Sequence, residues 1–326
     1  MVRCATSAVL GVALFATAGA LLAQAASPDR PVRIIVPFPP GGINDTIARP
    51  LAERMRSLLG NIVVENRAGA GGMIAATAVA RAEPDGHTIL LGSAATHLVG
   101  PLTATAPTYD PVKDFRPVAI VAVSGLAICV HPSLPVKTLQ DFVAFARARP
   151  NQLSYASAGT GSATHLAAEL FKSLVRLPSI AHVPYRGGAP ALADLLGGHV
   201  PVGVLNISSQ LIENHRTGKI RILAVTTATR VTSAPEIPAA RESGLPAMVA
   251  LNFAGLFVPA ATPAATVDRI AAALRAALAD PVMQKLLASS GLELSADDTP
   301  DKARRFIEQE ITRWSPLIRS LGLQPG

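Results

Sequence analysis

The stretch Pro37-Phe38-Pro39-Pro40-Gly41-Gly42-Ile43-Asn44-Asp45 separates an apolar, strand-like segment, Val32 to Val36, from a helical pattern that begins near Thr46. Three prolines stiffen the turn, since each fixes its own φ and removes a backbone donor. Two adjacent glycines allow backbone conformations that other residues avoid. Asp45 is a candidate cap for the helix, whose first N–H groups point back over the loop. The stretch is therefore either an anion-binding corner or an ordinary tight connection between a strand and a helix.

Short apolar runs alternate with helical patterns along most of the chain. Leu166, Leu170 and Leu174, for example, recur at helical spacing. Short strands that alternate with helices of this length predict an α/β fold, with parallel sheets covered by helices on both faces. The further strand-like runs are residues 62–65, 88–92, 118–123, 126–130, 200–205 and 220–226.

Several helix starts carry recognisable signals. Thr138 followed by Asp141 resembles a capping box. Thr262 and Thr299 each precede a proline and are candidate caps. The last helix carries apolar residues at helical spacing, including Trp314, which predicts a packing element rather than a cofactor site.

The two apolar runs 118–123 and 126–130 follow each other closely, with only Ser124-Gly125 between them. We interpret them as two strands that cross from one sheet to another, with a second crossing near residues 251–256. Two crossings predict a discontinuous first domain, residues 26–123 plus 252–326, around a continuous second domain, residues 124–251.

The amino-terminal residues 1–25 have the pattern of a secretory signal peptide. Arg3 supplies a positive start, residues 8–22 are apolar, and Ala23-Gln24-Ala25 is an A-x-A cleavage pattern. We therefore expect cleavage near Ala25 and an exported protein. Cys4 would leave with this segment, so the remaining Cys129 cannot form an internal disulfide.

The composition limits the function classes. A hydrophobic content of 49% and a charged content of 16% indicate a compact globular protein. The formal charge of +7 is compatible with anionic ligands, or it serves solubility, because the basic residues are scattered. Aromatic residues make up only 4% of the chain, so the stacking platforms of a single-strand binder are missing and we expect no nucleic acid partner.

Three further small-residue loops follow strand-like runs, at residues 92–97, 154–165 and 183–190. The second of these has a G-x-G pattern but lacks both the third glycine of a dinucleotide fingerprint and a P-loop lysine. In open α/β sheets, ligands bind beyond the carboxyl ends of strands, where all four loops are expected. Arg186 either pairs with a carboxylate or points to solvent, and His165 either donates to a ligand or is structural.

Catalytic machinery is not recognisable in the chain. There is no G-x-S-x-G nucleophile elbow and no H-E-x-x-H spacing among the seven histidines. A single mature cysteine excludes a Cys-based zinc site. We therefore expect no enzyme activity, no catalytic residue, no cofactor and no metal.

The chain resembles the Bug-type receptors, the extracytoplasmic substrate-binding proteins of tripartite tricarboxylate transporters. The resemblance extends over essentially the whole mature chain, in order. The motifs that carry it are Pro37 to Gly42 with Asp45-x-x-Ala48-Arg49, Val64 to Gly72, Pro84 to Thr88, Tyr109 to Phe115, Gly159 to Phe171, Val183 to Gly187, Asp194 to Gly198 and Gly218 to Arg221.

The resemblance implies a periplasmic binding protein of the type II-like class, with two α/β domains, a hinge and a ligand cleft between the domains. It implies a small organic acid as ligand, which the protein delivers to membrane permease subunits. One alternative is a receptor that presents its ligand to a membrane sensor kinase. The remaining alternative is a secreted hydrolase. We expect a monomer. Carried over residue by residue, the implied binding set is Phe38, Gly42, Asn44, Asp45, Ser93, Thr96, Gly159, Thr160, Gly161, Ser162, His165, Tyr185, Arg186 and Gly187.

The sequence departs from the family pattern in two places. Many relatives carry a run like F-D-N where this chain reads Val204-Leu205-Asn206, so Leu205 removes a carboxylate partner for a ligand ammonium group. From this we hypothesise a carboxylate ligand without an α-amino group. The second departure, Gly100-Pro101-Leu102-Thr103-Ala104, affects local loop contacts.

Overall fold

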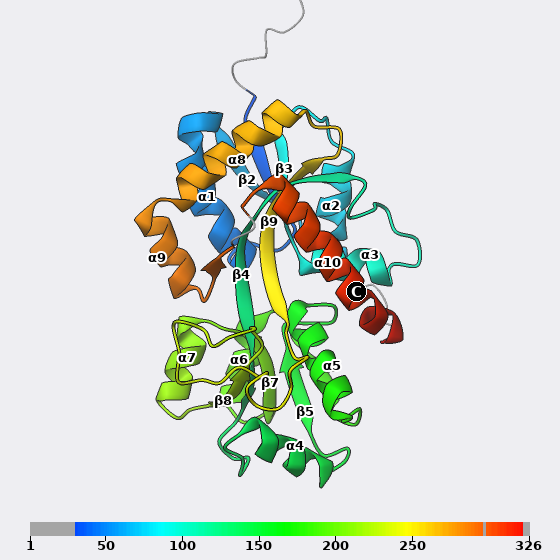
Figure 1. Ribbon diagram of the computed structural model, residues 1–326, viewed down its shortest axis with the longest axis vertical. Coiled ribbons are helices and arrows are strands. Elements are labelled where there is room, and N and C mark those ends of the chain that lie inside the picture. Colours follow the sequence, from blue (N-terminus) through cyan, green and yellow to red (C-terminus); the bar gives the residue numbers. More distant parts are fainter. Residues whose placement is uncertain (1–29, 296–297, 322–326) are drawn as a thin grey trace, which may run out of the picture.

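The computed structural model describes residues 30–295 and 298–321, so the predicted signal peptide lies outside the described residues. The molecule is elongated and has two lobes, with the long strands β4 (Phe115–Val130) and β9 (Leu251–Pro259) running between them (Figure 1). Both lobes combine strands with covering helices, which confirms the predicted α/β class.

The first lobe is built on β1 (Val32–Val36), which pairs in parallel with β2 (Ile62–Asn66) and β3 (Thr88–Ser93). Ile34 packs into a core with α1 and α8, whereas its neighbour Ile35 packs into a core with α2. Because alternate residues of a strand face opposite sides, a sheet covered on both faces requires an apolar strand throughout. The other elements of this lobe are α1 (Ile43–Leu59), a 3₁₀ turn (Ala70–Gly72), α2 (Met73–Ala80), a π-helical turn (Ala95–Val99), α3 (Gly100–Thr103), α8 (Ala264–Leu278), α9 (Pro281–Ser289), β10 (Glu293–Leu294) and α10 (Pro300–Ser320).

The second lobe is built on β5 (Ser154–Ser157), which pairs in parallel with β6 (Ala181–Pro184) and β7 (Val202–Asn206). One core lies under α6 and α7 and contains Cys129, which is a free thiol. Burial raises the pKa of this thiol to about 12. The remaining elements are α4 (Leu139–Arg147), α5 (Ala163–Val175), α6 (Gly188–Leu196), α7 (Ser209–Arg216) and β8 (Arg221–Val225).

The strand β4 belongs to both lobes. The predicted strands 118–123 and 126–130 are one continuous strand, so the prediction of two separate strands is wrong. Residues up to Gly125 pair with β9, and residues from Leu126 onward pair with β7 and β8. The strand therefore changes its pairing partners, and not its direction, close to the predicted domain boundary. We propose the same two domains as before, residues 26–123 plus 252–326 and residues 124–251.

The expectation of parallel sheets holds for the outer strands and fails at the centre. The pairs β3–β9, β4–β9 and β4–β7 are all antiparallel. A parallel neighbour requires a crossover connection on one face of the same sheet, and β4 and β9 instead run from one lobe to the other. The hydrogen-bonded strand order is β2-β1-β3-β9-β4-β7-β5-β6, with β8 and β10 also pairing with β4.

The predicted helix starts are confirmed in two cases and wrong in one. Thr138 and Asp141 form a complete capping box at α4, and Thr299 caps α10. The expected cap Thr262 does not cap α8, because that helix begins one residue later, with Pro263 at the capping position and no side-chain cap.

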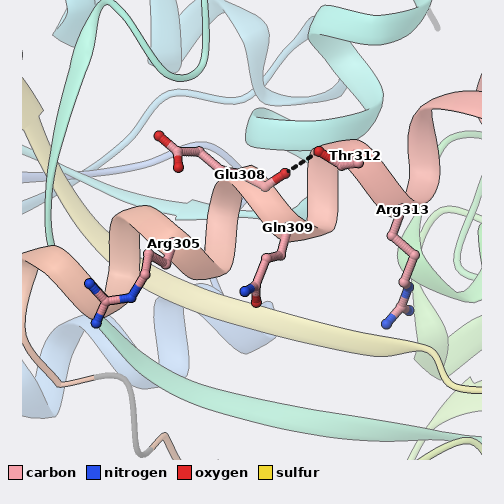
Figure 2. A pocket seen from close by; sticks show the side chains of 5 residues that line it. All are labelled: Arg305, Glu308, Gln309, Thr312 and Arg313. Carbon is pink, nitrogen blue, oxygen red and sulfur yellow. Dashed lines mark hydrogen bonds between the residues drawn. The ribbon is translucent and has the colours of Figure 1, made fainter.

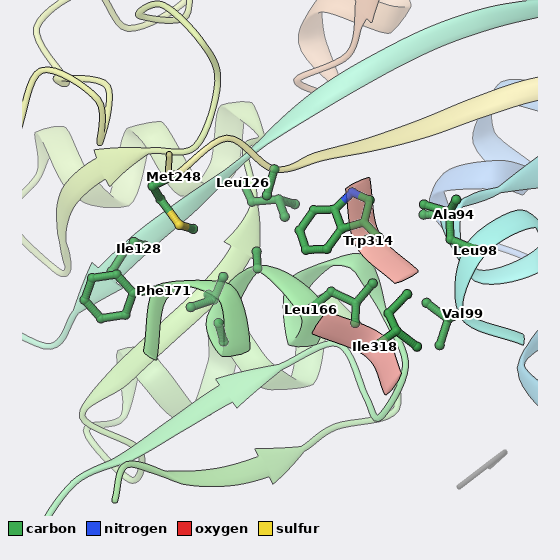
Figure 3. Packing of buried hydrophobic residues seen from close by; sticks show 14 of the residues in the cluster. Ala94, Leu98, Val99, Leu126, Ile128, Leu166, Phe171, Met248, Trp314 and Ile318 are labelled. Carbon is green, nitrogen blue, oxygen red and sulfur yellow. The ribbon is translucent and has the colours of Figure 1, made fainter. Parts of the chain in front are cut away.

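The last helix, α10, is a packing element, as its apolar pattern predicts, and it contacts both lobes. Trp314 and Ile318 lie in one cluster with Leu98 of the first lobe and Leu166 of the second (Figure 3). The indole N–H of Trp314 donates to Glu310 at 2.8 Å, so the buried ring has a polar partner. Within the described ranges, no helix is both long enough and apolar enough to span a lipid bilayer.

Candidate functional site

A cavity of about 850 Å³ lies between the two lobes. All four glycine- or small-residue loops contribute to its wall. Nine of the predicted site residues line it: Phe38, Gly42, Asn44, Ser93, Thr160, Gly161, Ser162, Arg186 and Gly187. The other five, Asp45, Thr96, Gly159, His165 and Tyr185, do not line it and lie behind the loops.

The first loop ends at Gly42, which is the N-cap of α1 and makes no side-chain cap. The first N–H groups of a helix have no intrahelical partner, so this end of α1 offers free donors at the cavity wall. Position 41 favours glycine, because the φ of Gly41 is +81°, in the left-handed region. Gly42 has an ordinary φ of −74°. Of the two glycines that allow unusual backbone conformations, Gly41 alone adopts one.

Asp45 does not cap α1, contrary to the sequence prediction, because the helix begins two residues earlier, at Ile43. Its carboxylate instead reaches back and accepts from the N–H of Gly41 at 3.0 Å and from Arg49 at 2.9 Å. Asn66 donates to the same carboxylate at 3.0 Å. The hydrogen bond from Arg49 lowers the pKa of Asp45, and burial opposes this effect. Asp45 therefore holds the loop in shape from behind.

The second loop follows β3 and begins with Ser93, whose hydroxyl oxygen is buried and has no hydrogen-bond partner. Thr96 is fully buried, and its hydroxyl accepts from the N–H of Ser93 at 2.9 Å. The next residue, His97, stacks on Phe257 with ring centroids 3.7 Å apart. Burial lowers the pKa of His97 to about 3, so its ring is neutral. Thr96 and His97 thus support Ser93 from the protein interior.

The third loop follows β5 and is held by hydroxyl groups. Ser162 caps α5 by accepting from the N–H of His165 at 3.2 Å, and its own hydroxyl donates to the Gly159 carbonyl at 2.7 Å. Thr164 accepts from the N–H of Ala158 at 2.9 Å. Gly159 has a φ of +122°, and a Cβ there would lie 2.8 Å from the Tyr185 carbonyl oxygen. The third loop therefore uses most of its polar groups internally.

His165 lies in the first turn of α5, as predicted, but its ring turns away from the cavity. It is 4% exposed, and its Nδ1 accepts from the N–H of Gly161 at 3.1 Å. Burial lowers the pKa of this imidazole. His165 contacts the loop rather than the cavity.

The fourth loop follows β6 and brings Arg186 and Gly187 to the cavity at the start of α6. Arg186 is exposed and makes no ion pair with any described residue. Tyr185 points elsewhere, because its hydroxyl donates to Asp194 at 2.6 Å. Burial raises the pKa of the Tyr185 hydroxyl to about 12.

Sequence reasoning missed part of the cavity wall. Ala68 to Gly71 and Met73 line it, although that segment entered the sequence analysis only as part of the family resemblance. Asn206 and Asn252, at the ends of β7 and β9, also line it. Both asparagines lie beside the point where β4 passes between the lobes, since Asn206 pairs with Leu126 and Asn252 pairs with Ser124. The linear sequence does not reveal this position.

Leu205, which the sequence analysis placed opposite a ligand ammonium group, does not line the cavity. It is 3% exposed and packs in the core under α6 and α7. Because successive residues of a strand face opposite sides, its neighbour Asn206 faces the cavity instead.

The charge of the cavity wall is one-sided. Among the described residues that line it there is no aspartate or glutamate, and Arg186 is the one side chain with a permanent charge. The remaining polar groups are hydroxyls, amides and backbone N–H groups. Nowhere in residues 30–295 and 298–321 do three His, Cys, Asp or Glu side chains gather as a metal site would require. The donors and the single positive charge of the wall suit an anion.

A second depression, of about 360 Å³, lies on the outer side of α10 (Figure 2). All five of its lining residues come from this one helix, and they include both basic and acidic side chains. Because a single helix forms it, this depression does not enclose a ligand from two sides as the cavity between the lobes does.

Comparisons with known proteins agree with this geometry. A family model described as the tripartite tricarboxylate transporter family receptor matches residues 47–323. Protein BugT of Bordetella pertussis is 36% identical over 319 residues, 97% of each chain. The structure of R. palustris Rpa4515 with adipate is 34% identical, with a TM-score of 0.80 over 92% of this chain and 100% of the other. The structure of MatC from Rhodopseudomonas palustris with bound malate is 33% identical, with a TM-score of 0.79 over 89% of this chain and 99% of the other.

The fold is that of a solute-binding protein of two α/β domains, as the family resemblance implied, and a cavity lies between the two lobes. The chain belongs to the tripartite tricarboxylate transporter receptor family. The relatives are substrate-binding receptors, and the chain is not an enzyme.

Proposed function

We propose that this receptor captures a small organic carboxylate without an α-amino group in the cavity between its lobes. The observation that carries the proposal is the charge of the wall, which combines an unpaired Arg186 with no acidic side chain. Arginine recognises carboxylates through paired N–H donors. The uncapped starts of α1 and α6 add backbone donors and the positive ends of two helix dipoles from opposite lobes.

The same wall disfavours an α-ammonium group. An ammonium group that enters the cavity loses water and meets Arg186, a like charge, with no carboxylate nearby to compensate. Selectivity against amino acids therefore follows from the whole lining rather than from Leu205. The relatives solved with adipate and malate bind carboxylates that lack an amino group, which supports this choice of ligand class.

Delivery of the ligand to a membrane permease, a periplasmic location after cleavage near Ala25, and action as a monomer are further parts of the proposal. Membership of the receptor family supports the first two. Closure of the two lobes about β4 and β9 would bring the loops of the two lobes together around the ligand.

The decisive experiment is a calorimetric comparison of matched ligands, preceded by a thermal-shift screen of organic acids. Succinate against aspartate, and adipate against 2-aminoadipate, isolate the ammonium group. We expect the ligand without the amino group to bind at least about tenfold more tightly in each pair that binds, since about 1.4 kcal/mol of desolvation suffices for that factor. Equal or tighter binding of the amino acids would contradict the proposal.

Arg186→Gln should weaken carboxylate binding by about tenfold to a hundredfold, the range for a hydrogen bond to a charged group. The matched control is Arg269→Gln on α8, which removes the same charge from an exposed side chain outside the cavity. Equal affinities of the two variants would remove Arg186 from the site.

A further inference from the structure

Two imidazole rings, one buried (His165) and one half-buried (His182), lie directly behind the third loop. His165 of α5 and His182 of β6 stack with ring centroids 4.1 Å apart and an angle of 8° between their planes. Neither ring lines the cavity. The stack continues to Tyr155 of β5, whose ring centroid lies 4.8 Å from that of His182. Three successive elements of the second lobe thus contribute one ring each to a stack beneath the loop.

Each imidazole is linked to a glycine N–H group of the loop. The N–H of Gly161 donates to Nδ1 of His165 at 3.1 Å. The N–H of Gly159 donates to the Ser157 hydroxyl at 3.1 Å, and that hydroxyl shares a 2.7 Å hydrogen bond with Nε2 of His182. The cavity-lining Thr160 lies between these two anchored glycines.

We propose that His165 and His182 are positioning residues that hold the Gly159–Ser162 segment in its ligand-binding shape, and that protonation of His165 releases this segment. The inference rests on the proposed function, because the shape of the segment matters only if the cavity binds the ligand. Glycine can adopt more backbone conformations than any other residue, so a loop that contains Gly159 and Gly161 is free to change shape unless it is anchored. Both glycines have positive φ values, +122° and +74°. An anchor on each glycine N–H therefore selects one conformation among many.

Protonation breaks the anchor for a chemical reason. Nδ1 accepts from Gly161 only while its lone pair is free, and an imidazolium has an N–H at both positions. Two imidazolium rings 4.1 Å apart would also repel each other. The other ionisable groups that face the pair are Glu169, Lys172 and Tyr155. Glu169 accepts from Lys172 at 2.8 Å and from Tyr155 at 2.7 Å, so its charge is already partnered.

The direction of the pH effect follows from the environment. Burial lowers the pKa of His165 below its usual value, and burial together with His165 lowers that of His182 to about 4. A lowered pKa in the folded state means that the neutral rings stabilise the fold fully above the usual value of 6.5. That stabilisation is lost as the pH falls from there toward the lowered values, and the loop is released when the pH falls through the lowered pKa of His165 itself.

Four variants of the full chain test the proposal. His165→Asn keeps an acceptor near the Nδ1 position without a titrating ring, and His165→Leu removes the acceptor. His182→Gln keeps a polar group near Nε2 for Ser157. His131→Asn is the control, since His131 bonds Ser133 and does not line the cavity. The readouts are amide hydrogen exchange at Gly161, which needs no ligand, and calorimetry with adipate and malate from about pH 7 to about pH 4.

We expect His165→Leu to speed exchange at Gly161 and to weaken carboxylate binding about tenfold, because a donor loses its partner. His165→Asn and His182→Gln should retain most of the affinity near neutral pH, and His165→Asn should flatten the fall in affinity on acidification. Unchanged exchange and affinity in His165→Leu, or an unchanged pH profile in His165→Asn, would overturn the proposal. If the wild type binds neither acid, the proposed function is in question, and exchange at Gly161 still decides whether His165 anchors the loop.

Discussion

The first and third loops of the cavity share one plan, a strand followed by a glycine-rich turn and a helix, but they are held in different ways. A charged group holds the first loop: the Asp45 carboxylate binds the N–H of Gly41, with Arg49 and Asn66 as its other partners. Neutral groups hold the third loop, where Ser162 and His165 bind its backbone.

The difference determines what each loop offers to a ligand. The start of α1 has no side-chain cap, so its backbone donors face the cavity. The start of α5 is capped by Ser162, and the N–H of Gly161 is bound to His165. The first loop thus offers backbone N–H groups of α1 to a ligand. The third loop mainly offers the Thr160 side chain and a fixed backbone conformation that forms part of the cavity wall. The two loops also differ in pH sensitivity, because the contribution of Asp45 to stability is lost only below its usual pKa of 3.8, whereas that of His165 begins to fall below its usual pKa of 6.5.

We expect the largest loss of stability from Gly159→Ala, which strains the backbone of the third loop. Its φ of +122° is unfavourable for an L-residue, and the new Cβ would lie 2.8 Å from the Tyr185 carbonyl oxygen. We expect a loss of about 2–3 kcal/mol in the free energy of unfolding, measured by urea titration. Gly188→Ala is the control, because Gly188 has no atom near its Cβ position and no positive φ. Equal stabilities of the two variants would show that the third loop relaxes freely.

The next effect is that of Asp45→Asn, which removes the charged support of the first loop. The side chain of Asp45 is 7% exposed and that of Arg49 is 54% exposed, so solvent screens part of the ion pair. We expect a loss of about 1 kcal/mol in the free energy of unfolding, with Glu53→Gln on the same helix as a nearly neutral control. Glu53 pairs with Arg56, but both side chains are well exposed.

The pH dependence of the Asp45→Asn effect separates the two loops. A carboxylate with a lowered pKa stabilises the fold fully above its usual value of 3.8 and loses that contribution only as the pH falls through the lower, folded value. The loss caused by Asp45→Asn should therefore be equal at about pH 7 and about pH 5. A loss that changed over this range would mean that the pKa of Asp45 is raised rather than lowered in the folded state, and the contrast between the loops would be wrong.

Most of the elements could be predicted from the sequence because local periodicity and glycine loops determine them. The continuity of β4 could not, since Ser124-Gly125 has the composition of a turn and only pairing with β9 keeps it extended. The orientation of His165 depends on the N–H of Gly161, a partner that helical spacing does not identify. The family pattern points to Leu205, but only the pairing of β7 shows that Leu205 faces the core and that Asn206 faces the cavity.

The smallest expected effect is that of Gly42→Ala in the first loop, and it tests whether the two loops use glycine for different reasons. Gly42 has an ordinary φ of −74°, and a Cβ there would meet only the Pro39 carbonyl oxygen at 3.5 Å. Alanine is a poorer N-cap than glycine, but it also reduces the freedom of the unfolded chain, and these effects are of similar size. The free energy of unfolding should therefore change by less than about 0.5 kcal/mol. Because Gly42 lines the cavity, Gly42→Leu should leave stability nearly unchanged while it weakens carboxylate binding, measured by calorimetry. If Gly42→Ala were as destabilising as Gly159→Ala, the first loop would depend on glycine for its backbone shape as the third loop does.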